Sequence, residues 1–115
     1  MRTLAVVSWM ALMVAPALAQ QDHAMPGMGS PADKDMMAGM QTMNHDMGAA
    51  PMTGDADRDF VAMMIPHHQG AVAMAQVELR YGKDKAMRRL AMDIVAAQKK
   101  EIALMQRWQA AHPVR

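Results

Sequence analysis

The chain of 115 residues contains no cysteine, so no disulfide can stabilise it and no thiol can act as a nucleophile or metal ligand. Aromatic residues make up only 3%, which leaves aliphatic residues and methionine to build a core. Beyond the first residues, no segment approaches the roughly 20 apolar residues that a membrane-spanning helix needs. Stability must therefore come from helix packing, a bound metal or self-association.

The N-terminus has the pattern of a secretory signal. One positive charge at Arg2 precedes an almost unbroken apolar run from Leu4 to Val14. Ala17-Leu18-Ala19 then matches the small-x-small pattern of a cleavage site. The alternative is an uncleaved N-terminal anchor, but the cleavage site and the polar residues that follow favour removal. We therefore expect residues 1–19 to be removed and the protein to work in the periplasm or outside the cell.

Methionine is the residue type that stands out. Three of the 17 methionines fall within residues 1–19, which leaves 14 among the remaining 96 residues of the 115. Thioether sulfur is soft and uncharged, so it binds Cu(I) or Ag(I) without losing a proton. The alternative, methionine as a flexible filler of a core, is a serious one for the C-terminal half. In the N-terminal half there is little else to pack against, and metal binding is favoured.

Residues 20–54 are rich in Gly, Pro, Asp and Met, a composition that predicts a mobile arm. One stretch is ambiguous, because four methionines recur at helical spacing with Asp33 available as N-cap and Gly48 as a stop. Glycine and asparagine within the stretch weaken this helix. We expect it to form when metal binds its face; the alternatives are an irregular metal-binding loop and docking on the rest of the chain without metal. The four methionines are Met36, Met40, Met43 and Met47.

Residues 55–110 predict an all-α unit of two long helices. Aspartates suit a helix start near residue 55, and Gly82 marks its end. A second helix is expected over residues 84–108, followed by a tail at 111–115. Because the connection is short, the helices should be antiparallel neighbours. A hairpin leaves one side of each apolar stripe uncovered, so we expect two chains to associate into a four-helix bundle.

Polar residues interrupt both apolar stripes at one level of this hairpin. His67 interrupts the first stripe, and Gln98 with Glu101 interrupts the second. Folding the chain about its short turn places His67 opposite Gln98 and Met64 opposite Glu101. One interpretation is a histidine satisfied by a hydrogen bond to Glu or Gln. The other is a metal site at which imidazole, thioether and carboxylate converge, and helix geometry alone favours neither.

The most specific signal is the run Met64-Ile65-Pro66-His67-His68-Gln69-Gly70-Ala71, which is followed by Met74. Here the chain resembles the family catalogued as domain of unknown function 305, which includes CopM-like periplasmic copper-binding proteins. The resemblance covers residues 55–110 and also rests on Gln98, Glu101-Ile102 and Met105. It implies a helical fold of ferritin-like appearance. For the copper-handling members it implies binding of Cu(I), Cu(II) or Ag(I) through Met and His.

We therefore expect a copper-binding protein, with silver as a second ion, that acts as a buffer or carrier in copper homeostasis or resistance. Its partner would be a periplasmic copper exporter, an oxidase or another metallochaperone. The charges of the two halves cancel, so nucleic acid is not an expected partner. The candidate ligands in residues 55–110 are Met63, Met64, His67, His68, Met74, Glu101 and Met105. Those in the arm are His23, Met25, Met28, Met36, Met37, Met40, Met43, His45 and Met47.

Three other functions compete with metal binding. A di-iron oxidase is improbable, because such sites need Glu-x-x-His pairs and neither Glu78 nor Glu101 is followed by histidine at that spacing. No other catalytic motif is present, so we expect no enzyme. A methionine-based scavenger of oxidants is the second alternative. It predicts no particular histidine spacing, whereas metal binding does. The third is a structural helical module, which leaves the arm unexplained.

Overall fold

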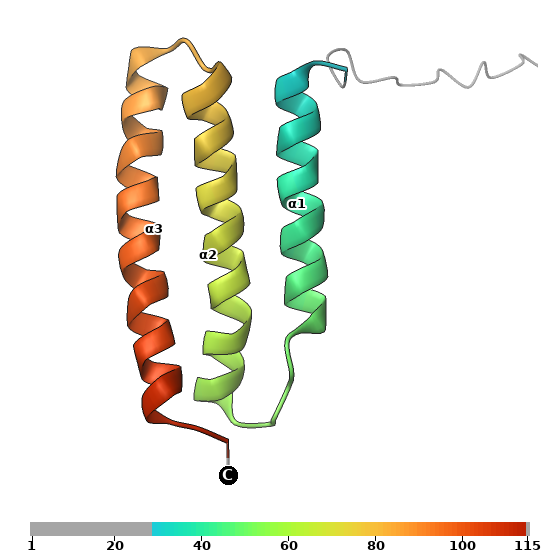
Figure 1. Ribbon diagram of the computed structural model, residues 1–115, viewed down its shortest axis with the longest axis vertical. Coiled ribbons are helices and arrows are strands. Elements are labelled where there is room, and N and C mark those ends of the chain that lie inside the picture. Colours follow the sequence, from blue (N-terminus) through green and yellow to red (C-terminus); the bar gives the residue numbers. More distant parts are fainter. Residues whose placement is uncertain (1–28, 115) are drawn as a thin grey trace, which may run out of the picture.

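The computed structural model describes residues 29–114 and consists of helices connected by short segments, with no strand in that range. The helices are α1 (Pro31–Ala49), α2 (Ala56–Tyr81) and α3 (Lys85–Ala111). They run antiparallel to their neighbours in a single row with α2 in the middle (Figure 1). α2 packs on both neighbours, whereas α1 and α3 do not pack on each other. The predicted all-α class and the helical hairpin are confirmed.

The hairpin of α2 and α3 forms where capping residues predict it. The side chain of Asp55 accepts the backbone N–H of Arg58 at 3.0 Å, and Asp84 caps α3 in the same way. Between them, Gly82 ends α2 by donating its N–H to an α2 carbonyl at 2.7 Å. Arg88 of α3 then donates to the carbonyl of Gly82 at 3.1 Å, which holds the two helix ends together. The predicted boundaries are therefore confirmed to within about one turn.

Over residues 31–49 the structure differs from the expected mobile arm, because this segment is the helix α1. Its N-cap is Ser30 rather than Asp33, and the helix runs past Gly48 to Ala49. The side chain of Ser30 accepts the N–H of Asp33 at 3.1 Å, and the carboxylate of Asp33 accepts the N–H of Ser30 at 3.2 Å. This capping box satisfies two helix-start donors at once. Local capping therefore supports a helix that composition disfavours.

Two glycines let α1 approach α2 closely. A β-carbon placed on Gly70 of α2 would overlap the side chain of Met43, and one placed on Gly39 of α1 would lie 3.4 Å from the β-carbon of Ala73. Met43 of the methionine row therefore packs against the backbone of α2. Docking of this helix on the rest of the chain is one of the alternatives that the sequence leaves open. It also supplies the packing partner that the sequence of the arm does not reveal.

An ion pair reinforces this packing at the N-terminal end of α1. The carboxylate of Asp35 accepts hydrogen bonds from Arg80 at 2.7 Å and from the hydroxyl of Tyr81 at 2.8 Å. Both partners lie at the C-terminal end of α2. Because the three side chains are solvent-exposed, the pair contributes at most about 1 kcal/mol, and it serves mainly to fix the register of α1 on α2.

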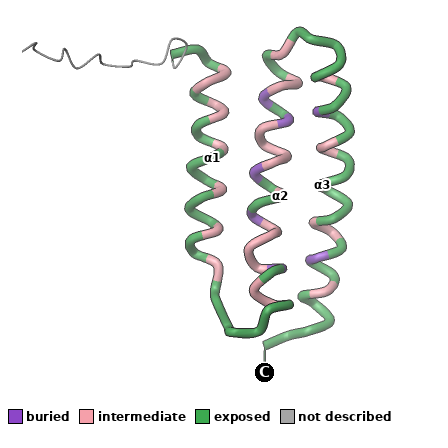
Figure 2. The backbone as a smooth tube through the Cα atoms, turned by 180° about the vertical axis from the view of Figure 1, so that it is seen from behind, coloured by how far each residue is buried: buried purple, intermediate pink, exposed green. Residues whose placement is uncertain are grey.

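Buried residues are few and concentrate in α2, as Figure 2 shows. The apolar core consists of side chains that are each at most 8% exposed, and no side chain in residues 29–114 is completely buried. The described helices form a single layer in which α1 and α3 cover two sides of α2. Both faces of this layer are left open. None of α1, α2 and α3 is long and apolar enough to cross a membrane. The core residues are Val61, Ala75, Val77, Ala91 and Met105.

Candidate metal site

His68, rather than His67, lies at the interface between α2 and α3. The Nε2 atom of His68 is 2.5 Å from Oε2 of Glu101 on the facing helix. The His68 side chain is only 13% exposed, whereas that of Glu101 is 56% exposed. His67 projects about 100° away on α2 and is exposed. The predicted pairing of His67 with Gln98 is therefore wrong.

The register of the two helices also differs from the prediction by about one turn. The sequence places Met64 opposite Glu101, whereas the structure places His68 there, four residues further along α2. One cause is the turn, in which three residues (82–84) lie outside the helices. The other is that helical side chains lean toward the N-terminus of their own helix, so antiparallel partners touch further along both chains.

The protonation pattern of His68 leaves one ring nitrogen free. Carboxylate oxygens can only accept hydrogen bonds, so Nε2 of His68 carries the proton shared with Glu101. In the neutral imidazole, Nδ1 then has a lone pair, and this atom is buried without a hydrogen-bond partner. Oε1 of Gln98, one turn before Glu101 on α3, is also buried without a partner. The interface thus holds two buried polar atoms without a hydrogen-bond partner, Nδ1 of His68 and Oε1 of Gln98.

Two candidate thioether ligands lie one turn from this pair. Met64 precedes His68 by four residues on α2 and is half-buried. Met105 follows Glu101 by four residues on α3 and is 8% exposed. Because the helices are antiparallel, both methionines lie on the same side of the His68–Glu101 contact, at the adjacent level. The arrangement brings imidazole, carboxylate and thioether groups to neighbouring positions on two helices.

The remaining candidate ligands are spread over α1 and α2. Met37 and Met40 of α1 are 42% and 38% exposed, respectively. His45 is exposed as well and contacts only Asp46, at 3.1 Å. The candidates His23, Met25 and Met28, like the expected signal at 1–19, lie outside the described residues. The half-buried methionines are Met36, Met43 and Met47 on α1, with Met63 and Met74 on α2.

No group of three His, Cys, Asp or Glu side chains in residues 29–114 is arranged to hold a metal ion. The histidine–carboxylate pair at the α2–α3 interface is thus flanked by thioethers rather than by further nitrogen or oxygen ligands. Thioethers and imidazole are ligands that suit Cu(I) and Ag(I), while carbonyl and carboxylate oxygen suit harder ions. The contact that the structure shows directly, between His68 and Glu101, joins an imidazole and a carboxylate.

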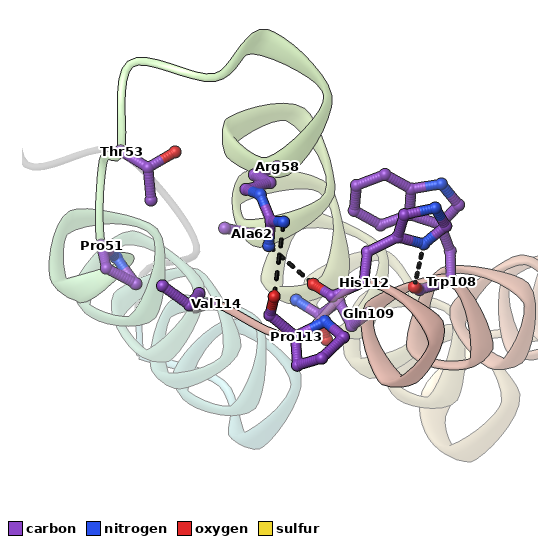
Figure 3. A pocket seen from close by; sticks show the side chains of 9 residues that line it. All are labelled: Pro51, Thr53, Arg58, Ala62, Trp108, Gln109, His112, Pro113 and Val114. Carbon is purple, nitrogen blue, oxygen red and sulfur yellow. Dashed lines mark hydrogen bonds between the residues drawn. The ribbon is translucent and has the colours of Figure 1, made fainter.

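A cavity of about 220 Å³ lies at the open end of the hairpin (Figure 3). Arg58 donates from Nη1 to the carbonyl of His112 at 2.6 Å and from Nη2 to that of Pro113 at 3.4 Å. The His112 ring stacks on Trp108 with ring centroids 4.3 Å apart. Sequence reasoning assigns His112 and Pro113 only to the end of the helix. Their contacts tie the C-terminal segment to the start of α2, and the cavity has no methionine in its lining.

The chain matches the model of the family described as Domain of unknown function (DUF305) over residues 5–109. It belongs to this family. The match extends the resemblance, which rests on residues 55–110, across α1 as well. No curated protein matches the chain. Membership in the DUF305 family carries no assigned function, so function has to be argued from the side chains themselves.

Proposed function

We propose that this DUF305 protein binds a soft metal ion, Cu(I) or Ag(I), and serves as an extracytoplasmic buffer or carrier rather than as an enzyme. The secretory pattern of residues 1–19 supports export. The methionine content supports a soft ion, because thioethers bind such ions without competition from protons. A copper exporter, an oxidase or another metallochaperone would give or receive the ion.

The observation that carries the proposal is the free Nδ1 atom of His68. Histidines that ligate metals commonly donate their other ring N–H to a carboxylate, which fixes the tautomer and the orientation of the ring. Glu101 occupies that position on Nε2 of His68. A hydrogen bond alone would account for Nε2 but leaves Nδ1 buried and unpaired, which is unfavourable. A metal ion at Nδ1 uses the lone pair that the fold leaves free.

Met64 and Met105 are the thioethers that would complete such a site. Each is one turn from a member of the His68–Glu101 pair, and methionine has three rotatable bonds with which to reach an ion. Both lie at or near the α2–α3 interface, where water is partly excluded. Because thioether sulfur is uncharged, a monovalent ion bound there adds a single positive charge beside the carboxyl group of Glu101.

The test replaces His68 with glutamine and compares His45→Gln as a matched control. Both histidines contact a carboxylate, but the side chain of His45 is 80% exposed and that of His68 is 13% exposed. Competition with a Cu(I) chelator should show affinity reduced at least about tenfold in His68→Gln, the range seen when a support of a metal site is lost. His45→Gln should keep the affinity of the α2–α3 site, because His45 lies on α1 and not at this interface. Equal affinities for all three proteins would rule out the His68 site.

A scavenger of oxidants is the second candidate, and the exposure of methionines favours it. Met52 and Met92 are 57% and 52% exposed, so oxidants can reach their sulfurs. This function requires no histidine and no ordered site. Mass spectrometry after peroxide treatment separates the two candidates. Sulfoxide formation that Ag(I) fails to slow at any methionine would favour scavenging over metal binding.

A further inference from the structure

The interface between α1 and α2 has two edges of different chemistry. One edge opens into a cavity lined by the polar side chains of Thr42 and Asp46 on α1 and Gln69 on α2. Asp46 and Gln69 also line the neighbouring cavity that reaches Ile65 and the segment after α1. Polar groups and water-sized spaces thus characterise this edge. The other edge is defined by the residues that project in the opposite direction from the same helices.

Helical periodicity identifies those residues. Met40 precedes Thr42 by two residues and Met47 follows it by five, so both project roughly 140–200° away from it. On α2, His67 and Met74 stand in the same relation to Gln69. In each helix the two residues are seven positions apart, about two turns, and therefore share one side. The edge opposite the cavity accordingly carries three thioethers and one imidazole.

The register of α1 on α2 brings these residues to matching levels. Gly39 lies opposite Ala73, and Met43 lies against Gly70. In an antiparallel pair with this register, Met40 lies at the level of Met74 and Met47 at the level of His67, within about one residue rise of 1.5 Å. Met43, packed on Gly70, lies between the two levels. His67 and Met40 are exposed, and Met47 and Met74 are half-buried, so an ion can reach the edge.

We infer that this edge is a second soft-metal site with two levels, Met40 with Met74 and Met47 with His67. The levels are seven residues, about 10.5 Å, apart along the helices, so each pair would hold its own ion. It rests on the proposed function, and it is separate from the His68–Glu101 contact, which joins α2 to α3 instead. Its ligands come from two helices, so ion binding and the docking of α1 are thermodynamically coupled. Cu(I) or Ag(I) would hold α1 on α2, and loss of the ion would release part of that stability.

Packing without metal is the alternative role for these methionines. Leucine and methionine have similar volume and hydrophobicity, so leucine serves packing nearly as well but removes the sulfur. The test variant is therefore Met40→Leu with Met47→Leu. The control is Met87→Leu with Met92→Leu, which removes the same number of sulfurs. Both methionines lie on α3, are exposed and are not among the candidate ligands.

Two measurements on the full chain, with Ag(I) as the probe, distinguish metal binding at this edge from packing without metal. Native mass spectrometry should show two Ag(I) fewer bound to Met40→Leu/Met47→Leu than to the parent chain, because the variant removes a thioether from each level. Limited proteolysis between α1 and α2, at residues 50–55, should slow with Ag(I) in the parent and in the control but not in the test variant. His67→Gln should lose only the ion at the Met47 level, whereas His68→Gln should keep the Ag(I)-dependent protection.

The outcomes also separate this inference from the proposed function. A test variant that binds as much Ag(I) as the parent and is protected as well would overturn the second site and leave the His68 site intact. Protection lost equally in the control would overturn it too, because the sulfurs of Met87 and Met92 lie on α3 and off this edge. A parent chain that binds no Ag(I) at all would overturn the proposed function and, with it, this site.

Discussion

Met43 of α1 lies so close to Gly70 of α2 that the backbone of α2 has no room for a β-carbon at this position. A methyl group on Gly70 would come within 2.9 Å of the β-carbon of Met43 and would overlap the atoms beyond it. The β-carbon of Met43 is fixed to the backbone of α1, so rotation of the side chain cannot relieve the whole overlap. The docking of α1 on α2 thus depends on one glycine in the middle helix.

Replacing Gly70 with alanine should therefore loosen α1. In an isolated helix this change is favourable by up to about 1 kcal/mol, but here overpacking should reverse the sign and lower the free energy of unfolding by about 1–3 kcal/mol. Urea denaturation measures this loss. Hydrogen exchange should show that protection falls mainly in α1, while α2 and α3 keep theirs.

Gly48→Ala is the matched control for this substitution. Gly48 also lies within a helix, but a β-carbon there would meet nothing within 4 Å. The control should be neutral or more stable by up to about 1 kcal/mol, because only helix propensity changes. If Gly70→Ala were as stable as Gly48→Ala, close contact with Met43 would not be what docks α1.

The same contact explains which features the sequence could predict. Caps at Asp55, Gly82 and Asp84 are local signals, so the bounds of α2 and α3 follow from neighbouring residues alone. The helical structure of α1 does not follow from its neighbouring residues. Its own glycines disfavour a helix, and its packing partner, Gly70, lies on another element. A mobile arm is the reasonable expectation for the composition of residues 31–49 taken by themselves.

The candidate site, too, could be predicted only in part from the sequence. Sequence patterns identify the level of the hairpin at which histidine, glutamine and glutamate meet. They do not decide between His67 and His68, since adjacent residues project about 100° apart and a rotation of α2 by that amount about its axis exchanges them. The register depends on the three-residue turn and on the direction in which side chains lean. Both belong to three-dimensional packing, so the exact pairing had to come from the structure.

Asp59 should make the start of α2 sensitive to acid. The backbone N–H of Thr53, at 2.8 Å, is the main cause of an Asp59 pKa below its ordinary value of 3.8, and the Thr53 hydroxyl and the N–H of Gly54 act in the same direction. A carboxylate with a lowered pKa in the folded state stabilises that state above pH 3.8, and the contribution is lost as pH falls through the lower value. The melting temperature should therefore fall as pH decreases from 3.8 through the lowered pKa of Asp59.

A comparison of two variants separates the contribution of Asp59 to stability from that of other carboxylates. Asp59→Asn should lower the melting temperature near neutral pH and should have less effect as pH falls from 3.8 through the lowered pKa of Asp59, below which the parent is protonated too. Asp93→Asn is the control, because Asp93 is exposed on α3 and makes no hydrogen bond from its side chain among the described residues. A melting-temperature difference for Asp59→Asn that stays constant from pH 7 to pH 2 would contradict the prediction.

Self-association is the remaining prediction, and the single layer of helices gives it a structural basis. The grooves between α2 and α3 are bordered by Leu90 and Leu104, which are 49% and 59% exposed. Burying a leucine completely contributes about 1.5–3 kcal/mol, so a second copy that covers this face would gain from both positions in each chain. Light scattering of the parent chain at micromolar concentration should therefore give the mass of a dimer.

Charge placed on this face should separate the copies. Leu90→Lys with Leu104→Lys should give the mass of a monomer, because two lysines in each chain would have to be buried without partners. Met92→Lys with Ala96→Lys adds the same charge to exposed positions outside these grooves and should remain dimeric. Circular dichroism checks that both variants keep their helices. A parent chain that is monomeric with and without Ag(I) would refute the dimer, and dissociation of both variants alike would show that net charge, rather than the leucine face, controls association.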